Sequence, residues 1–145
     1  MGTEKNKAIA SEQLETVFNK QNPDAVDKYY TADLVYHDPN LPQFRDLDGF
    51  KQWIRALKTS FSDSDFRAVA DDIFAEGDRV AMRWTLNHKG NRAEYFGIPP
   101  NDKPVKMTGV SVFRFVGDKI AELWLSYDLL GALRQQGLIP PMGPG

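Results

Sequence analysis

The sequence predicts an α+β domain in which three helices precede a long, curved antiparallel sheet. Two observations support this. Up to about residue 61, apolar side chains recur mainly at helical spacing, with one brief strand pattern between helices. From residue 66 onward, apolar and polar side chains alternate in two long stretches, each interrupted by a glycine turn. Helices followed by hairpins are typical of a layered fold with the helices packed on one face of the sheet.

Each of the N-terminal elements has its own signal. The first helix is expected near 5–20, where one helix face carries Ala10, Leu14, Val17 and Phe18. A second, short helix is expected near 23–30, because Asn22 can cap it and Pro23 suits the first helical position. A brief strand closed by Pro39 follows. The third helix is expected near 48–61, with a wide apolar stripe formed by Phe50, Trp53, Ile54, Leu57 and Phe61.

Two hairpins form the rest of the sheet, turning at 76–78 and at 117–118. A two-residue loop at 117–118 would place Ser111 opposite Trp124 and Met107 opposite Asp128. One face of the last strand would then carry Glu122, Trp124, Ser126 and Asp128, and the other would carry Leu123, Leu125 and Tyr127. Helices would cover the first face, and the second would be a homodimer interface. A bulge in either strand would swap these faces locally.

Composition limits the classes of partner. The 145 residues suit a single domain (1–145), with a tail at 138–145 that is expected to be extended. A net charge of −2 with mixed signs gives no reason to expect nucleic acid or an anionic membrane. The absence of cysteine excludes disulfides and thiolate chemistry. Neither a secretory leader nor an apolar run of about 18 residues is visible, so a cytoplasmic location is expected.

Several segments, in order, resemble one known family. They are "VYHDP", "FAEGDRVAMRWTLNHKG", "FGIPPNDKPVKMTG" and "VGDKIAELWLSYDLLGALRQQG". From about Leu14 to Gly137 the chain resembles the SnoaL-like polyketide cyclases. The resemblance implies a nuclear-transport-factor-2-like cone that encloses an apolar pocket. It also implies that an aspartate ending the last long strand is the acid/base of an intramolecular aldol ring closure. Asp128 matches that aspartate, and His88 and His37 match the family's two histidines.

Each candidate also has a simpler interpretation. Asp128 precedes a short helix and can be its N-cap, although a partly desolvated carboxylate beside Trp124 would suit acid/base work. His88 or His37 could hydrogen-bond a substrate carbonyl or relay a proton, or could face solvent. Asp38 is interpreted as turn chemistry only. The substrate would contact Trp53, Trp84, Met107, Ser111 and Trp124, and the loop at 89–104 could be a lid or only a connection.

The function predicted from these residues is a cyclase that needs no cofactor and acts on a small, apolar, oxygenated molecule. No histidine–carboxylate spacing suits a metal site, the G-x-S-x-G motif is absent, and the glycines form no phosphate loop. Alternative functions are a dehydratase, an isomerase, an epoxide hydrolase, or a binding module without catalysis. An epoxide hydrolase would need a second carboxylate and an arginine beside Asp128, and the sequence places no such group there.

Overall fold

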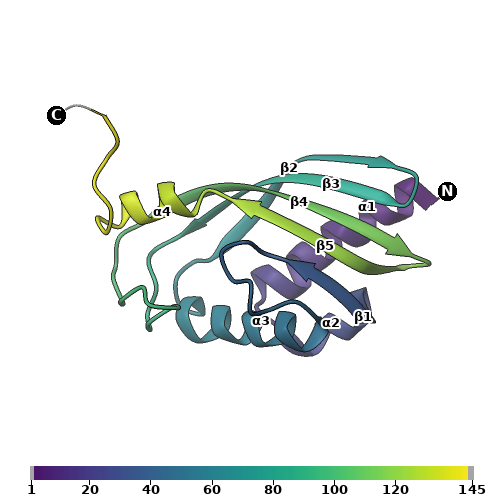
Figure 1. The fold of residues 1–145 in the computed structure, drawn as a ribbon, viewed down its shortest axis with the longest axis horizontal. Helices are drawn as coiled ribbons and strands as arrows, with labels where there is room; N and C mark the ends of the chain where they lie inside the picture. The colour runs from purple at the N-terminus through teal and green to yellow at the C-terminus, as the bar shows by residue number, and fades with distance from the viewer. Residues whose placement is uncertain (1, 144–145) are drawn as a thin grey trace.

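Helices form one layer of the structure, a computed structural model that describes residues 2–143 (Figure 1). Helix α1 (Gly2–Gln13) continues into a π-helical turn (Leu14–Asn19), and a 3-10 turn (Pro23–Ala25) leads into α2 (Val26–Tyr29). Helix α3 (Leu47–Phe61) begins at Asp46, whose carboxylate accepts a hydrogen bond from the Gly49 N–H at 2.8 Å. The three predicted N-terminal helices are therefore present, and a short helix α4 (Leu129–Gln135) follows the sheet.

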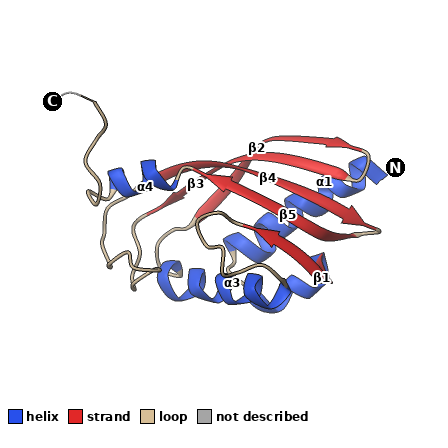
Figure 2. Cartoon of the chain, in the orientation of Figure 1, coloured by secondary structure: helices blue, strands red, loops and turns tan. Residues whose placement is uncertain are grey.

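Five strands form one sheet in the order β1-β5-β4-β3-β2 (Figure 2). They are β1 (Tyr30–His37), β2 (Arg67–Glu76), β3 (Arg79–His88), β4 (Val105–Val116) and β5 (Lys119–Tyr127). Strands β2 to β5 are antiparallel, as predicted, and the predicted α+β fold is confirmed. The expectation of a purely antiparallel sheet is wrong at one edge, because β1 pairs in parallel with β5. Tyr30, expected to end the second helix, begins this strand instead.

A β-bulge at Ala121 reverses the predicted faces of β5. The loop at 117–118 pairs Val116 with Lys119 as predicted, but beyond Phe115 and Ile120 the register shifts by one residue. As a result Trp124 lies opposite Val112, while Ser111 lies opposite Leu125. A bulge adds one residue to one strand, and every later side chain then points to the opposite face. The residues that face the helices are Leu123, Leu125 and Tyr127, and not the set that contains Trp124.

The core lies between the concave face of the sheet and the helices α1 and α3. Buried aromatic side chains from both layers meet there, as Phe50 and Trp53 of α3 pack against Tyr36 of β1 with ring centroids 5.0 and 5.8 Å away. Residues from both layers, including Ile54, Met82 and Phe113, are almost fully buried. None of the helices in residues 2–143 combines the length and the apolar composition of a membrane span.

Candidate functional site

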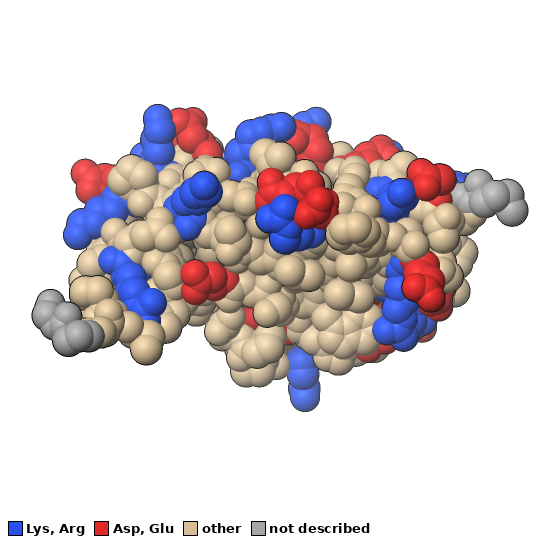
Figure 3. Space-filling model, turned by 90° about the horizontal axis from the view of Figure 1, so that it is seen from above, with Lys and Arg blue, Asp and Glu red and all other residues tan. Residues whose placement is uncertain are grey.

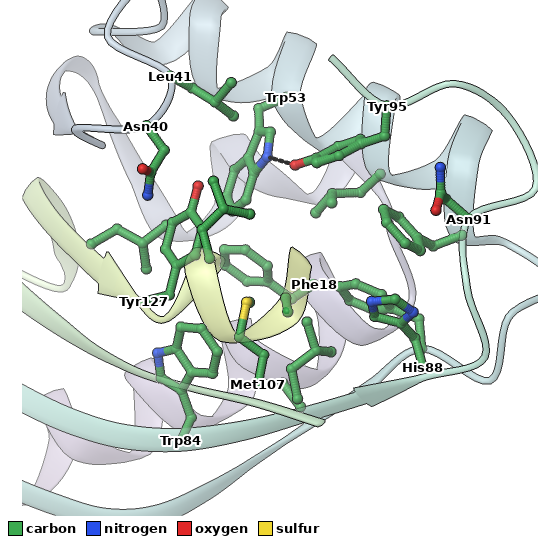
Figure 4. Close-up of a pocket in the computed structure, with 18 of the residues that line it drawn as sticks. Phe18, Asn40, Leu41, Trp53, Trp84, His88, Asn91, Tyr95, Met107 and Tyr127 are labelled. Carbon is green, nitrogen blue, oxygen red and sulfur yellow. Dashed lines mark hydrogen bonds between the residues drawn. The ribbon is translucent and has the colours of Figure 1, made fainter. Parts of the chain in front are cut away.

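A cavity of about 170 Å³ lies between the sheet and the helical layer (Figure 4). Its wall is contributed by the end of α1 and the π-helical turn, the loop after β1, α3, strands β2 to β5, α4 and the loop at 89–104. Most of the wall is apolar or aromatic, with a few polar groups between these side chains. None of the described side chains that line it is an aspartate, glutamate, lysine or arginine. An apolar cavity with a few convergent polar groups is the usual form of a small-molecule site.

Four of the five side chains expected to contact substrate line this cavity, namely Trp53, Trp84, Met107 and Ser111. The two indoles are held by hydrogen bonds: Trp84 Nε1 donates to Ser111 Oγ at 3.0 Å, and Trp53 Nε1 donates to Tyr95 Oη at 2.7 Å. Trp84 lies flush against β4 because Gly109 has no Cβ to collide with its ring. Their contact with a substrate stays a prediction, but their positions suit it.

The fifth residue, Trp124, and His37 lie on the outer face of the sheet, so the expectation that they line the pocket is wrong. The two rings stack on each other with centroids 5.3 Å apart, and the Arg79 guanidinium lies 5.1 Å from the Trp124 ring centroid. His37 Nε2 lies 2.8 Å from a carboxylate oxygen of Glu122. This hydrogen bond is the main reason that the pKa of Glu122 is lowered. The bulge in β5 places Trp124 on this face, and the alternation of β1 places His37 there, since the preceding residue Tyr36 is buried.

Asp128 is an exposed helix N-cap and does not line the cavity. Its Oδ1 accepts a hydrogen bond from the Gly131 N–H at 2.9 Å, one of the backbone donors left without a partner at the start of α4. The expectation that Asp128 shares a pocket face with Met107 fails because of the register shift. The β5 side chains that do face the helices include no carboxylate. The geometry therefore supports the capping interpretation of Asp128.

Replacing Asp128 with alanine should lower the free energy of unfolding by about 1 kcal/mol, because the cap is lost. Asparagine at this position should cost only a few tenths of that amount, since its side-chain oxygen caps almost as well. Urea unfolding of the two variants and the wild type measures the difference. Equal stability of the alanine variant and the wild type would contradict the capping role.

His88 is the histidine that the structure brings to the cavity. The ring is buried against Phe61 and Phe66, with centroids 4.7 and 6.3 Å away. Nδ1 accepts a hydrogen bond from the Gly90 N–H at 2.9 Å, and burial lowers the pKa of His88 to about 4. At neutral pH the ring is therefore uncharged, with its single proton on Nε2. Within residues 2–143, Nε2 has no hydrogen-bond partner.

The loop at 89–104 closes one side of the cavity. Asn91 holds the loop in place: its amide nitrogen donates to the carbonyls of Ala93, Ile98 and Pro99, and its oxygen accepts from Gln136, the residue that follows α4, at 3.2 Å. Gly90 can adopt its φ of +96° and approach Asn101 closely because it has no side chain. Tyr95 from this loop lines the cavity, where burial raises its pKa. The loop is thus a fixed part of the wall in this structure.

Tyr127 and Asp38 are polar groups at this site that the sequence interpretation missed. Tyr127 lines the cavity, and its hydroxyl donates to the buried carboxylate of Asp38 at 3.0 Å. In Figure 4, Tyr127 and Asn40 lie at one side of the cavity, and His88 lies at the other. A signal for Asp38 was present in the sequence, since it continues the alternation of the buried residues Leu34 and Tyr36. Within residues 2–143, no cluster of three or more His, Asp or Glu side chains could hold a metal ion.

Comparison with known proteins places this chain in a family. Residues 8–136 match the SnoaL-like polyketide cyclases. The chain belongs to this family. Among curated proteins, none matches the sequence. Membership in the SnoaL-like polyketide cyclases supports a cyclase or a related enzyme of the nuclear-transport-factor-2-like fold.

Solved structures of this fold cover almost the entire chain. An inferred polyketide cyclase from Acidithiobacillus ferrooxidans is 30% identical, with a TM-score of 0.78 over 90% of this chain and 93% of its own. IdmH from Streptomyces antibioticus, also an inferred polyketide cyclase, is 25% identical, with a TM-score of 0.75 over 91% of this chain and 98% of its own. TsrD from Streptomyces laurentii is 22% identical, with a TM-score of 0.81 and coverages of 94% and 97%, and shows the shared fold.

Proposed function

We propose that this SnoaL-like protein closes a ring by an aldol-type reaction on a compact, largely apolar molecule that carries carbonyl groups. The observation that carries the proposal is the uncharged His88 ring in the wall of an apolar cavity. Family membership supports the same class of chemistry. The reaction moves protons and forms a carbon–carbon bond, so general acid/base groups and hydrogen-bond donors suffice for it.

His88 is suited to polarise a carbonyl group. Because Gly90 donates to Nδ1, the other ring nitrogen must be the donor, and it is the ring's remaining polar group. A neutral imidazole can donate one hydrogen bond to a carbonyl oxygen, through the ring nitrogen that carries the proton. As the new bond forms, negative charge develops on that oxygen, and a fixed donor in an apolar site stabilises it more than water would. Tyr95, held by the Trp53 indole, places a second hydroxyl in the wall of the same cavity.

Ring closure of simple diketones tests this function. Heptane-2,6-dione and 1-phenylhexane-1,5-dione are suitable probes, because each forms a cyclohexenone by an intramolecular aldol reaction and loss of water. The expected result is a rate of enone formation above that of buffer, with saturation as the diketone concentration rises. Binding of both probes without any acceleration would overturn the proposal.

A second function, a binding module without catalysis, is supported by one specific observation. The aspartate expected to act as acid/base is an exposed helix cap, and no ionised side chain lines the cavity among the described residues. The diketone experiment separates the two functions, since a binding module would bind the probes and leave their rate of closure unchanged. An epoxide hydrolase is not supported, because none of the described lining residues is an arginine or a carboxylate.

We also propose that two chains associate through the outer face of the sheet, although not through the residues first expected. Leu123, Leu125 and Tyr127 point inward. The outer face instead exposes Val110 and Phe74, among charged side chains of both signs; Figure 3 shows such mixed charges on the upper surface of the molecule. Light scattering should give about twice the chain mass of 16.4 kDa. Val110→Glu should shift that value toward the monomer, and a wild-type monomer would contradict the proposal.

A further inference from the structure

A buried carboxylate lies at the edge of the cavity, outside the groups used so far. Asp38 is 3% exposed and follows the last residue of β1. Its Oδ2 accepts hydrogen bonds from the hydroxyls of Tyr127 at 3.0 Å and Tyr36 at 3.3 Å. Its Oδ1 accepts from the Asn40 N–H at 2.9 Å. No lysine, arginine or histidine in residues 2–143 forms an ion pair with it.

Turn formation explains only half of these contacts. An aspartate at the start of a turn needs one oxygen to accept from the backbone two residues later, and Oδ1 does this with Asn40. Such turns form on the surface at no desolvation cost. The second oxygen is turned inward to two tyrosine hydroxyls, and burying a carboxylate without an ion partner is unfavourable. A buried titratable group at the edge of a pocket is a candidate for a functional role.

The topology of the sheet brings Asp38 to the cavity. Strands β1 and β5 are parallel, and His37 at the end of β1 lies opposite Trp124. Both strands therefore end at the same edge of the sheet, where Asp38 follows one strand and Tyr127 completes the other. The Tyr127 side chain lines the cavity while its hydroxyl proton is directed to Asp38. Its oxygen keeps lone pairs that can accept a proton from a bound molecule.

We propose that Tyr127 and Asp38 form a proton relay that removes the proton next to a substrate carbonyl and later returns it. This inference rests on the proposed ring closure. Figure 4 shows Tyr127 and His88 on different sides of the cavity, so the two groups can serve the two halves of one substrate. Tyr127 acts on the carbon that becomes the nucleophile. His88 acts on the carbonyl that is attacked.

The relay balances protons and electrons without any additional reactant. When the substrate C–H bond breaks, its electron pair forms an enolate, the proton moves to Tyr127 Oη, and the tyrosine's own proton moves to Asp38 Oδ2. The enolate carbon then attacks the second carbonyl, and that oxygen becomes an alkoxide beside His88. The product then turns so that its alkoxide reaches Tyr127 and takes the proton of that hydroxyl. Asp38 returns its proton to the tyrosine, which restores both groups.

The electrostatic surroundings favour this direction of transfer. Burial raises the pKa of Asp38, which makes its carboxylate a better proton acceptor than a solvated one. Burial, followed by the nearby Asp38 charge, raises the pKa of Tyr127. The negative charge therefore stays on Asp38, and the tyrosine conducts the proton without becoming a phenolate. The other titratable groups that influence this pair are the neutral hydroxyls of Tyr36 and Tyr95.

Variant kinetics on a diketone that the wild type converts test the relay. Asp38→Asn and Tyr127→Phe should each lower kcat by about 10²–10⁴, the range for a positioned acid/base group. Asp128→Asn is the matched control, because it makes the same change at a strand end outside the cavity, and its kcat should equal that of the wild type. If Asp38→Asn behaves like Asp128→Asn while the wild type is active, the relay is wrong and the proposed function stands. If the wild type is inactive, the proposed function fails instead.

The pH dependence separates a proton acceptor from a structural carboxylate. Asp38 must be ionised to accept a proton, so kcat should fall as the pH drops through its raised pKa. This fall is the acidic limb of the plot of kcat against pH, and Asp38→Asn should lack it. Tyr36→Phe removes one donor to the ionised carboxylate and should move the limb to higher pH. Unfolding temperatures of all variants identify any that fail to fold. An unmoved limb in a folded Tyr36→Phe variant would contradict the assignment.

A titration by NMR tests the pair without any turnover. With ¹³C-labelled aspartate, the Asp38 carboxyl signal of the wild type should titrate at a pKa above the ordinary value of aspartate. In Tyr127→Phe it should titrate higher still, because the ionised form has lost a hydrogen bond. Identical Asp38 titrations in the two proteins would show that the groups are not coupled, and the relay would be overturned.

Discussion

The protein should lose about 3 kcal/mol of stability to the titration of His88 as the pH falls from about 6.5 to about 4. The pKa of this histidine is near 6.5 in the unfolded chain and is lowered to about 4 in the fold. Between these two pH values His88 is protonated in the unfolded chain and neutral in the folded chain. The stabilisation is therefore complete above the unfolded pKa and is lost as the pH falls toward the folded one.

Urea unfolding near pH 7 and near pH 4 measures this loss, and His88→Phe is the reference. Phenylalanine keeps a ring in the space between Phe61 and Phe66 but cannot titrate. Other groups, such as Glu122 with its lowered pKa, titrate in both proteins and cancel in the comparison. The wild type should lose about 3 kcal/mol more than the variant. Equal losses in the two proteins would mean that His88 is not desolvated in solution.

The helices and the hairpins could be predicted because each is specified by neighbouring residues. The α3 stripe, the capping of the 3-10 turn by Asn22 and the loop at 117–118 are local patterns, and all are present in the structure. The parallel pairing of β1 with β5 is not local, since these strands are far apart in the chain. The sequence carries an alternation for β1 but nothing that states its partner or direction.

The candidate site was less predictable because its faces depend on one inserted residue. Without the bulge at Ala121, strict alternation puts Trp124 and Asp128 inside. The register shift exchanges Trp124 for Leu125 and brings Tyr127 to the cavity. The polar residues Glu122 and Ser126 share the outer face with Trp124, which was the available hint that this face meets solvent. Family resemblance correctly indicated the fold, but the geometry of these side chains comes from the register.

His88→Phe should also lower the kcat of ring closure by about 10²–10³, the usual effect of removing one fixed donor to a developing oxyanion. The aromatic ring of phenylalanine replaces the imidazole against Phe61, so the cavity should keep its shape and apolar ligands their affinity. The variant lacks the hydrogen bond that Nε2 would donate. In the wild type Nε2 carries the proton because the Gly90 N–H donates to Nδ1. That bond strengthens as charge develops on the substrate oxygen, so its loss should lower kcat more than it raises KM.

A second substitution separates donation from mere packing. His88→Gln retains an N–H donor on a flexible side chain and should recover part of the lost rate, because a less fixed donor stabilises the oxyanion less well. The measurements are kcat and KM for a diketone that the wild type converts, together with the affinity of each variant for the unreactive ligand naphthalene. A folded His88→Phe variant with wild-type kcat would remove histidine from the mechanism. Tyr95, the other hydroxyl in that wall, would then be the donor to examine next.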